Sequence, residues 1–469
     1  MKYTSIASAF VPLLAAATAG ALPVDQDKAD ALAKRATDTT AINLDQCSGT
    51  PQHYASGVLY GVSGTNTPPQ SYLQDLKINY LSVGGAQTPT SGWGASKAAY
   101  QSRFATVVAD WKRIRANNGV LIIKTSDLWG ADATQPSNFP YPGDNGDWKS
   151  YDAFVQQIIA DVKANGMANS YTTQIEIWNE PDLGTTFWGR SQDQYLEMYL
   201  RGVRAFRAAF GKGSAAYLPI VGPSTAGRPE STNAWIAKWL STLQSNKDAT
   251  PDIYNWHLEG NDRNDPVVST GYLRGRLSEL GLSAGIGFQN NEYGVRSQQK
   301  PGYGAWFAAR FEKVKHNGMR GNWASGNLLR DNLADLLLKD GQGAYHTTGE
   351  YQEWKTYAGL EGAPCGTTTG SSVDSYAVSS SGARSASALV GNAGFTGSAN
   401  VVFAKVSSLA KDAKRYQAKV ERIPYNGGKE VTGLTAVSTS TVDVANDRIS
   451  VPIDYADADD AYLVTITAA

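Results

Sequence analysis

The chain of 469 residues has few of the side chains that bind metals or form cross-links: two cysteines, four histidines and four methionines. The cysteines and histidines do not stand at the spacing of a zinc site, and the sequence has no phosphate-binding or dinucleotide-binding loop. A Gly-x-Ser-x-Gly elbow at a strand-to-helix turn is also missing. We therefore expect no metal and no cofactor.

Charge of one sign is not in excess either, since the sequence has 42 lysines and arginines and 43 aspartates and glutamates. Without a basic surplus, the chain is not expected to bind nucleic acid through phosphates. After the N-terminus no apolar run approaches the roughly 20 residues that a membrane helix needs. The charged fraction is only 18%, whereas Gly, Tyr and Trp number 47, 24 and 12. Such a surface suits a neutral, hydroxyl-rich ligand.

The first 35 residues have the pattern of a secretion and processing signal. Residues 1–21 combine a basic start, an apolar stretch and a small-x-small site at 19–21, as in a signal peptide. A polar pro-segment, 22–35, ends in Lys34-Arg35 and resembles a fungal-type dibasic processing site, so the mature chain would begin near Ala36. An ordinary exposed basic pair is the alternative. We expect a secreted, extracellular protein.

Secretion gives the two cysteines a predicted role. An oxidising environment favours a disulfide between Cys47 and Cys365, which would tie the start of the mature chain to the region near residue 360. Two buried free thiols remain the alternative, because the sequence does not show their distance.

Strand-like and helix-like runs alternate eight times between Gly57 and about Asp340. This order and length predict a (β/α)₈ TIM barrel, which we assign to residues 57–358. A doubly wound open sheet is the alternative, although such a fold more often has a Gly-rich loop after its first strand. The predicted strands are Gly57–Val62, Asn79–Val83, Val120–Thr125, Gln174–Trp178, Leu218–Gly222, Asp252–His257, Gly285–Asn291 and Met319–Trp323.

Amphipathic stretches lie between these strands. Apolar residues recur at helical spacing over Lys97–Asn117. Ser191 is a plausible N-cap for a second helix. We expect Asn327–Lys339 to form the helix that closes the series.

The last part of the chain changes its periodicity. Apolar residues then alternate with polar ones, which predicts a C-terminal β-sandwich over 359–469. Gly362–Ser380 is rich in Gly, Ser and Thr, and we interpret it as a loop or linker. In the N-terminal segment 36–56, Thr40–Leu44 is strand-like and is expected to join the sandwich.

Two predicted strands end in a glutamate. Gln174-Ile175-Glu176-Ile177-Trp178-Asn179 leads to Glu180, which precedes a proline that removes a backbone donor and ends the strand. Glu292 follows the seventh strand in the same way. Barrel enzymes place their chemistry at these ends, and two carboxylates there can act on a glycosidic bond.

The Trp178-Asn179-Glu180-Pro181 motif resembles the acid/base motif of the clan A retaining glycoside hydrolases, and the whole pattern resembles glycoside hydrolase family 39. The resemblance implies that Glu180 is the acid/base, that Asn179 binds the sugar 2-hydroxyl and that Glu292 is the nucleophile. It also implies substrate-binding roles for residues at the barrel mouth. These are His257 after strand six, Tyr293 after the nucleophile, Trp323 after strand eight, and Trp129 and Trp188 in the loops after strands three and four.

The chain departs from the clan at strand two, where many members hold the nucleophile with an arginine. Lys124, Arg296 and Arg320 are three candidates for the replacing charge, and the sequence does not choose between them. Glu176 has the strand parity of Glu180, and we expect it to have a structural role. Glu259 is interpreted as a loop residue.

These observations predict a secreted, monomeric, retaining glycoside hydrolase with a carbohydrate as its partner. Its substrate would be a neutral cell-wall polysaccharide or the derived oligosaccharides, cleaved at β-glycosidic bonds. A transglycosylase would use the same two glutamates. A catalytically inactive carbohydrate-binding barrel would keep the aromatic residues and need neither glutamate.

Overall fold

The computed structural model describes residues 37–65, 67–260 and 264–469. The predicted signal peptide and pro-segment lie outside these residues. In the described part of the chain, no helix has the length and apolar character to traverse a bilayer.

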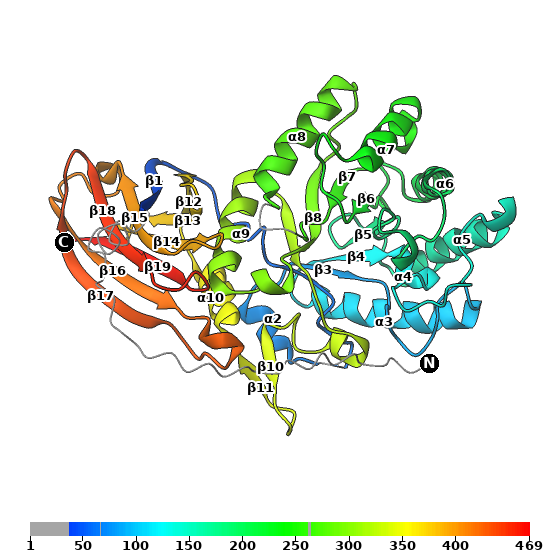
Figure 1. Ribbon diagram of the computed structural model, residues 1–469, viewed down its shortest axis with the longest axis horizontal. Helices are drawn as coiled ribbons and strands as arrows, with labels where there is room; N and C mark the ends of the chain where they lie inside the picture. Colours follow the sequence, from blue (N-terminus) through cyan, green and yellow to red (C-terminus); the bar gives the residue numbers. More distant parts are fainter. Residues whose placement is uncertain (1–36, 66, 261–263) are drawn as a thin grey trace, which may run out of the picture. The chain divides into compact units, whose positions relative to one another are not determined.

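Eight parallel strands close into a barrel, which confirms the predicted fold class (Figure 1). Neighbours along the chain pair in parallel, with a register shift between β6 and β7 and another between β8 and β9. The last strand pairs with the first, where Met319 meets Gly57. Buried branched residues fill the strands, as expected for parallel strands covered on both sides. The strands are β2 (Gly57–Leu59), β3 (Tyr80–Val83), β4 (Val120–Lys124), β5 (Thr173–Glu176), β6 (Ile220–Thr225), β7 (Ile253–Trp256), β8 (Gly287–Tyr293) and β9 (Asn317–Arg320).

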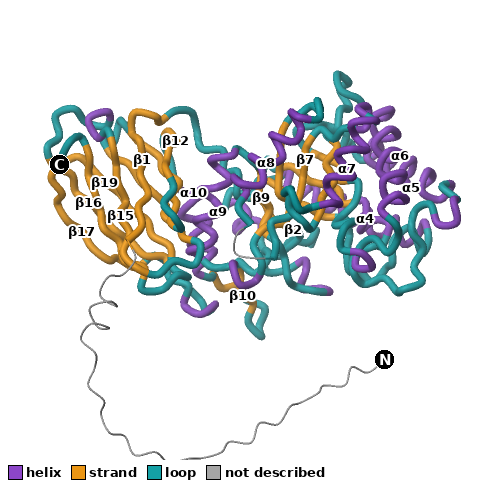
Figure 2. The backbone as a smooth tube through the Cα atoms, turned by 45° about the horizontal axis from the view of Figure 1, so that its top comes forward, coloured by secondary structure: helices purple, strands orange, loops and turns teal. Residues whose placement is uncertain are grey.

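Helices surround the barrel strands (Figure 2). Ser191 caps its helix as predicted, because its hydroxyl accepts a hydrogen bond from the Gln194 N–H at 3.2 Å. The helices are α2 (Gln70–Asp75), α3 (Lys97–Arg115), α4 (Thr125–Trp129), α5 (Lys149–Ala164), α6 (Gln192–Phe210), α7 (Ala234–Ser245), α8 (Pro266–Glu279), α9 (Pro301–Val314) and α10 (Gly349–Gly359).

The helix predicted over Asn327–Lys339 is wrong. That stretch contains a 3-10 turn, η5 (Gly326–Arg330), and then β10 (Leu337–Lys339), which pairs with β11 (Tyr345–Thr347). Four consecutive residues, Asn332–Asp335, have φ between 54° and 64°. Left-handed backbone cannot continue a right-handed helix, and the closing helix is α10 instead.

The remaining strands form the sandwich, in the order β17-β16-β19-β14-β13-β12-β1-β15-β18. All pairs are antiparallel except β1 with β15. Residues of both halves, such as Phe403 on β15 and Ile466 on β19, share one buried apolar core. The strands are β1 (Thr37–Cys47), β12 (Ala363–Thr368), β13 (Val373–Ser380), β14 (Ser385–Asn392), β15 (Gly397–Ala404), β16 (Arg415–Ile423), β17 (Thr435–Asp443), β18 (Arg448–Tyr455) and β19 (Ala461–Ala468).

The linker predicted over Gly362–Ser380 is wrong as well, because this stretch forms two strands, β12 and β13. A stretch rich in Ser and Thr suggests a loop, but Thr favours strands and both residues pair on the sheet here. β12 pairs with β1 on one side, where Cys47 faces Cys365. These two cysteines form the predicted disulfide.

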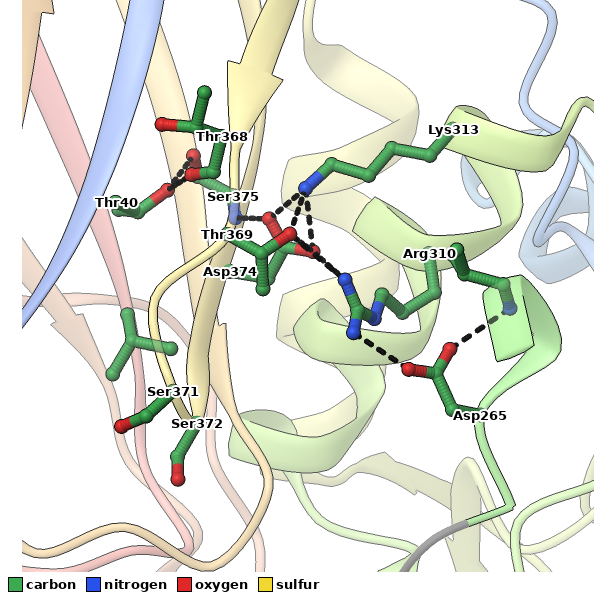
Figure 3. A network of polar contacts seen from close by, with 12 residues as sticks. Thr40, Asp265, Arg310, Lys313, Thr368, Thr369, Ser371, Ser372, Asp374 and Ser375 are labelled. Atoms are coloured by element: carbon green, nitrogen blue, oxygen red, sulfur yellow. Dashed lines mark hydrogen bonds and ion pairs between the residues drawn. The ribbon is translucent and has the colours of Figure 1, made fainter.

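Helix α9 joins the barrel to the sandwich through charged side chains (Figure 3). The buried carboxylate of Asp374 on β13 lies 3.0 Å from Arg310 and 2.6 Å from Lys313, both on α9. The other side of the Arg310 guanidinium contacts Asp265, the N-cap of α8, at 2.6 Å. These ion pairs fix the sandwich to the barrel wall.

Candidate active site

Glu180 lies four residues beyond β5, at the carboxyl end of the barrel, and is almost fully buried. Its N–H donates to the carbonyl of Ser224 on β6 at 2.8 Å. Its φ of 39° is in the left-handed region, which costs a residue other than glycine about 1–3 kcal/mol and is found most often at functional sites. The loop therefore holds Glu180 in a conformation that it would not adopt freely.

Glu292 lies near the end of β8 and contacts the ammonium group of Lys124, the last residue of β4. Lys124 Nζ and Glu292 Oε1 are 2.5 Å apart, and both side chains are buried. Burial alone would raise the pKa of Glu292, but His257 and Lys124 outweigh it and leave the pKa below its ordinary value. Glu292 is therefore held as a carboxylate.

Lys124 is thus the cation at Glu292, of the three that the sequence offered. Arg320 instead pairs with the buried Glu350. Arg296 donates to the carbonyl of Trp323 at 3.0 Å and lies 3.7 Å from Asp335.

His257, the residue after β7, lies between the two carboxylates and is fully buried. Its Nδ1 is 2.8 Å from Glu180 Oε1 and 3.7 Å from Glu292 Oε2. Burial lowers the pKa of His257, whereas Glu292 and Glu180 raise it, with a result of about 10. The imidazole is therefore charged at neutral pH and bridges the pair.

The two carboxylates differ in pKa direction although they are neighbours. Burial raises the pKa of Glu180, His257 lowers it and the charge of Glu292 raises it, and the result is above the ordinary value. One oxygen of Glu180 and one of Glu292 lie within 4.8 Å of each other. A protonated Glu180 beside an ionised Glu292 is the division between acid and nucleophile that carboxylate pairs use.

Glu259, in the loop after β7, joins the same cluster. One oxygen of Glu259 lies within 4.8 Å of ligand atoms of Glu180, His257 and Glu292. Glu259 lies in a loop as predicted, but no role in the site was expected of it; its position two residues after His257 is the signal that points to the site.

Two further predicted residues lie beside the pair. Asn179 is buried next to Glu180, and its Oδ1 has no hydrogen-bond partner in the described part of the chain. Trp323 is half-buried, and its indole N–H donates to the Gly294 carbonyl at 3.1 Å. This bond fixes the ring near the end of β8.

Glu176 lies deeper in the barrel and is fully buried. It accepts a hydrogen bond from the side-chain amide of Asn291. Burial raises the pKa of Glu176 to about 7, although Lys124 acts in the opposite direction. This placement agrees with a structural role beneath the reacting groups.

The remaining predicted aromatic residues are enclosed by protein. Tyr293 packs between Phe307 and Phe311 of α9. Trp129 donates to the Pro140 carbonyl at 2.8 Å and is 2% exposed. Trp188 donates to the Ser191 carbonyl at 3.0 Å and is 1% exposed. Because these rings have no open face, we do not include them in the proposed sugar site.

Glu180, His257, Glu259 and Glu292 also meet the distance condition for a metal site. The ammonium of Lys124 already lies against Glu292. A second cation at the same carboxylate would be repelled by that charge, so we expect these side chains to act without a metal ion.

Comparison with solved structures places the fold among known glycoside hydrolases. A protein from Neocallimastix frontalis is 22% identical, with a TM-score of 0.73, and the match covers 92% of this chain and 100% of that chain. The GH39 enzyme from Xanthomonas axonopodis pv. citri is 15% identical, with a TM-score of 0.56 and coverage of 96% and 100%.

A monomeric β-xylosidase from Caulobacter crescentus is 14% identical, with a TM-score of 0.56 and coverage of 92% and 99%. No protein-family model and no curated protein matches the chain. At these identities the comparisons establish the fold, and the resemblance to GH39 and other clan A enzymes is confirmed at that level.

Proposed function

We propose that the protein is a retaining glycoside hydrolase that cleaves β-glycosidic bonds by double displacement. The observation that carries this proposal is the pair Glu180 and Glu292. Their pKa values are displaced in opposite directions, and they have oxygen atoms within 4.8 Å. Inverting enzymes separate their carboxyl groups by about 6.5–9.5 Å to admit a water molecule, whereas retaining enzymes keep them about 5–5.5 Å apart.

In the first step Glu292 attacks the anomeric carbon while Glu180 gives its proton to the departing glycosidic oxygen. The bond between sugar and Glu292 forms as the glycosidic bond breaks. In the second step Glu180, now a carboxylate, takes a proton from water, which displaces Glu292 from the sugar. The catalytic groups then return to their starting state.

Lys124 and His257 support different parts of this cycle. Lys124 keeps Glu292 ionised for the attack, and its ammonium remains beside the oxygen that becomes an ester. His257 contacts Glu180 at 2.8 Å and stabilises it after it has lost its proton. We propose that Asn179 binds the hydroxyl next to the reacting carbon and that Trp323 contacts the apolar face of the sugar.

A neutral sugar is the substrate class that the charges favour. The chain has nearly equal numbers of basic and acidic residues, 42 and 43, whereas a polymer of uronic acids would usually be bound by clustered arginines and lysines. Solved structures with this fold include proteins described as a β-xylosidase, a GH30 endoxylanase and a glucosidase. We therefore infer action on a neutral cell-wall polysaccharide or its oligosaccharides.

Secretion is part of the proposal. The Cys47–Cys365 disulfide suits an oxidising compartment. The predicted leader at residues 1–35 supports the same location. We also propose that the protein acts as a monomer.

The function is tested by azide rescue on a panel of 2,4-dinitrophenyl β-glycosides of neutral sugars. We expect Glu180→Ala to hydrolyse the first bond, because this leaving group needs no proton, and then to accumulate glycosyl-enzyme. Azide should restore turnover and give a β-glycosyl azide. Glu292→Ala should be inactive alone, and any rescue by azide should come from the vacated nucleophile side and give an α-glycosyl azide.

Rescue of Glu180→Ala that gives an α-glycosyl azide would contradict the assignment of Glu180 as the acid/base. If both variants keep full activity, the two-glutamate mechanism is wrong. If the wild type turns over no substrate of the panel, an inactive binding barrel is indicated instead. Transfer of the sugar to a second sugar at high substrate concentration would identify a transglycosylase.

A further inference from the structure

Glu259 is a third carboxyl group in the cluster, and the mechanism above does not use it. One of its oxygens lies within 4.8 Å of an oxygen of Glu292, and Glu259 lowers the pKa of Glu292 as a side-chain hydrogen-bond partner. Two carboxyl groups can form such a bond only if one of them holds a proton. The proton must therefore belong either to Glu259 or to Glu292.

The surrounding charges decide between these two possibilities. Among the described residues, the titratable groups that act on Glu259 are Glu292, His257, Glu180 and Lys124. Of the described cations, Lys124 lies 2.5 Å from Glu292 and His257 lies 3.7 Å from it. The short ion pair with Lys124 makes Glu292 the ionised partner. The proton consequently remains on Glu259.

The second oxygen of Glu259 supports the same assignment. Glu259 Oε1 is buried and has no hydrogen-bond partner among the described residues. A buried carboxylate without donors at one oxygen is strongly unfavourable, whereas a neutral carboxyl group tolerates this much better. Burial, followed by the charge of Glu292, keeps the pKa of Glu259 well above its ordinary value.

We infer that Glu259 is a positioning residue, a neutral carboxylic acid that donates a hydrogen bond to Glu292 and holds the nucleophile in place for attack. This inference rests on the proposed function. Lys124 and Glu259 together then restrain the Glu292 carboxylate, which could otherwise turn toward His257 at 3.7 Å. Ionisation of Glu259 would replace an attraction by a repulsion and would inactivate the enzyme.

The protonation state can be measured without any substrate. Infrared difference spectra at neutral pH, wild type minus Glu259→Gln, should show the carbonyl stretch of a protonated carboxyl group. In the Glu292→Gln background, Lys124 loses its carboxylate partner and is free to stabilise an ionised Glu259. The same difference spectrum in that background should then lack the band. Absence of the band in the first spectrum would overturn the inference, whether or not the protein is a glycosidase.

The positioning role is tested with 2,4-dinitrophenyl β-xyloside, whose leaving group does not need the proton of Glu180. Glu259→Leu removes the hydrogen bond and should lower kcat/KM roughly 10–100-fold, the usual loss for a hydrogen bond to a charged group. Glu259→Gln keeps an N–H donor and should lose much less. The alkaline limb of kcat/KM should move to higher pH in Glu259→Gln, because glutamine cannot ionise.

A merely structural residue would lower the melting temperature in both variants and leave the alkaline limb where it is. That result would overturn the positioning role. If the wild type does not cleave the xyloside or any other glycoside of the panel, the proposed function fails, while the infrared comparison still decides the protonation of Glu259. If Glu259→Leu does not fold, the pH profile of Glu259→Gln carries the test.

Discussion

Replacing Lys124 by methionine removes the ammonium group that contacts Glu292 and leaves a side chain of similar length. Both side chains of this pair are buried, with 3% and 10% of their surface exposed, and their charged atoms are 2.5 Å apart. Removing one partner of a buried ion pair costs about 3–5 kcal/mol, because the other charge stays without compensation. Glu292 can avoid this cost by taking up a proton.

The size of the effect follows from the remaining charge. One pKa unit corresponds to about 1.36 kcal/mol, so the loss of Lys124 would raise the pKa of Glu292 by about 2–4 units if nothing else compensated. His257 still lies 3.7 Å from Glu292 Oε2 and reduces the change, and we expect about 2 units.

The sign of the pH effect follows from the role of Glu292, which attacks only as a carboxylate. In the wild type, the lowered pKa of Glu292 keeps this carboxylate ionised, and so active, into acid solution. In Lys124→Met the acid limb of kcat/KM should move up by about 2 pH units, so that kcat/KM falls about 100-fold at a pH below both limbs. The limb is measured with an activated aryl glycoside, for which Glu180 need not be protonated.

Lys313→Met is the matched control. Lys313, which is partly exposed, forms an ion pair at 2.6 Å with the buried Asp374, but between α9 and the sandwich. It should lower the melting temperature and leave the acid limb in place. If Lys124→Met folds and its acid limb coincides with that of the wild type, Lys124 does not control the ionisation of Glu292, and the reasoning fails.

Three further results are expected. Replacing both Cys47 and Cys365 by serine should destabilise the fold by about 2–5 kcal/mol in calorimetry and leave kcat/KM unchanged, because the disulfide joins β1 to β12 in the sandwich; a loss of activity in the folded variant would contradict this. Trp323→Ala should raise KM by roughly tenfold, since an aromatic platform for a ligand contributes about 1–3 kcal/mol, and an unchanged KM would remove Trp323 from the sugar site. Dialysis against EDTA should leave turnover intact, and its loss with recovery on adding a divalent ion would show a metal in the cluster.

The barrel was predictable because its signals repeat. Eight short apolar runs alternate with amphipathic stretches, and an error in one unit leaves the others in place. The final unit was mispredicted because apolar spacing alone suggested a helix over Asn327–Lys339. The left-handed turn at Asn332–Asp335 depends on contacts from elsewhere, such as the Leu333 N–H bond to the Gly61 carbonyl at 3.0 Å. The spacing of apolar residues along the chain does not predict such long-range contacts.

The two glutamates were predictable for another reason, since each was expected at the end of a strand and the ends of parallel strands meet at one face of a barrel. Lys124 remained one of three candidates because its partner lies on a strand far along the chain. Glu259 was predicted only as a loop residue, because a loop glutamate is usually exposed and only the fold brings it against Glu292.

The expectation for Tyr293 could have been improved from the sequence. Neighbouring side chains on a strand point to opposite faces. If Glu292 faces the reacting centre, the next residue faces the helices, and Tyr293 indeed packs on Phe307 and Phe311 of α9. Trp129 and Trp188 carried no such signal, because a tryptophan in a loop can face either the core or the solvent.

The central claim is that Glu292 forms a covalent bond with the sugar. Incubation with a 2-deoxy-2-fluoro glycosyl fluoride of the preferred neutral sugar should trap this intermediate, since the fluorine slows both steps and the good leaving group allows the first. Mass spectrometry of the digested protein should then show one equivalent of added sugar on the peptide that contains Glu292. Addition of the sugar to a different residue would contradict the account. Hydrolysis of the fluoride without inactivation of the enzyme, and with inverted configuration at the anomeric carbon, would contradict it as well.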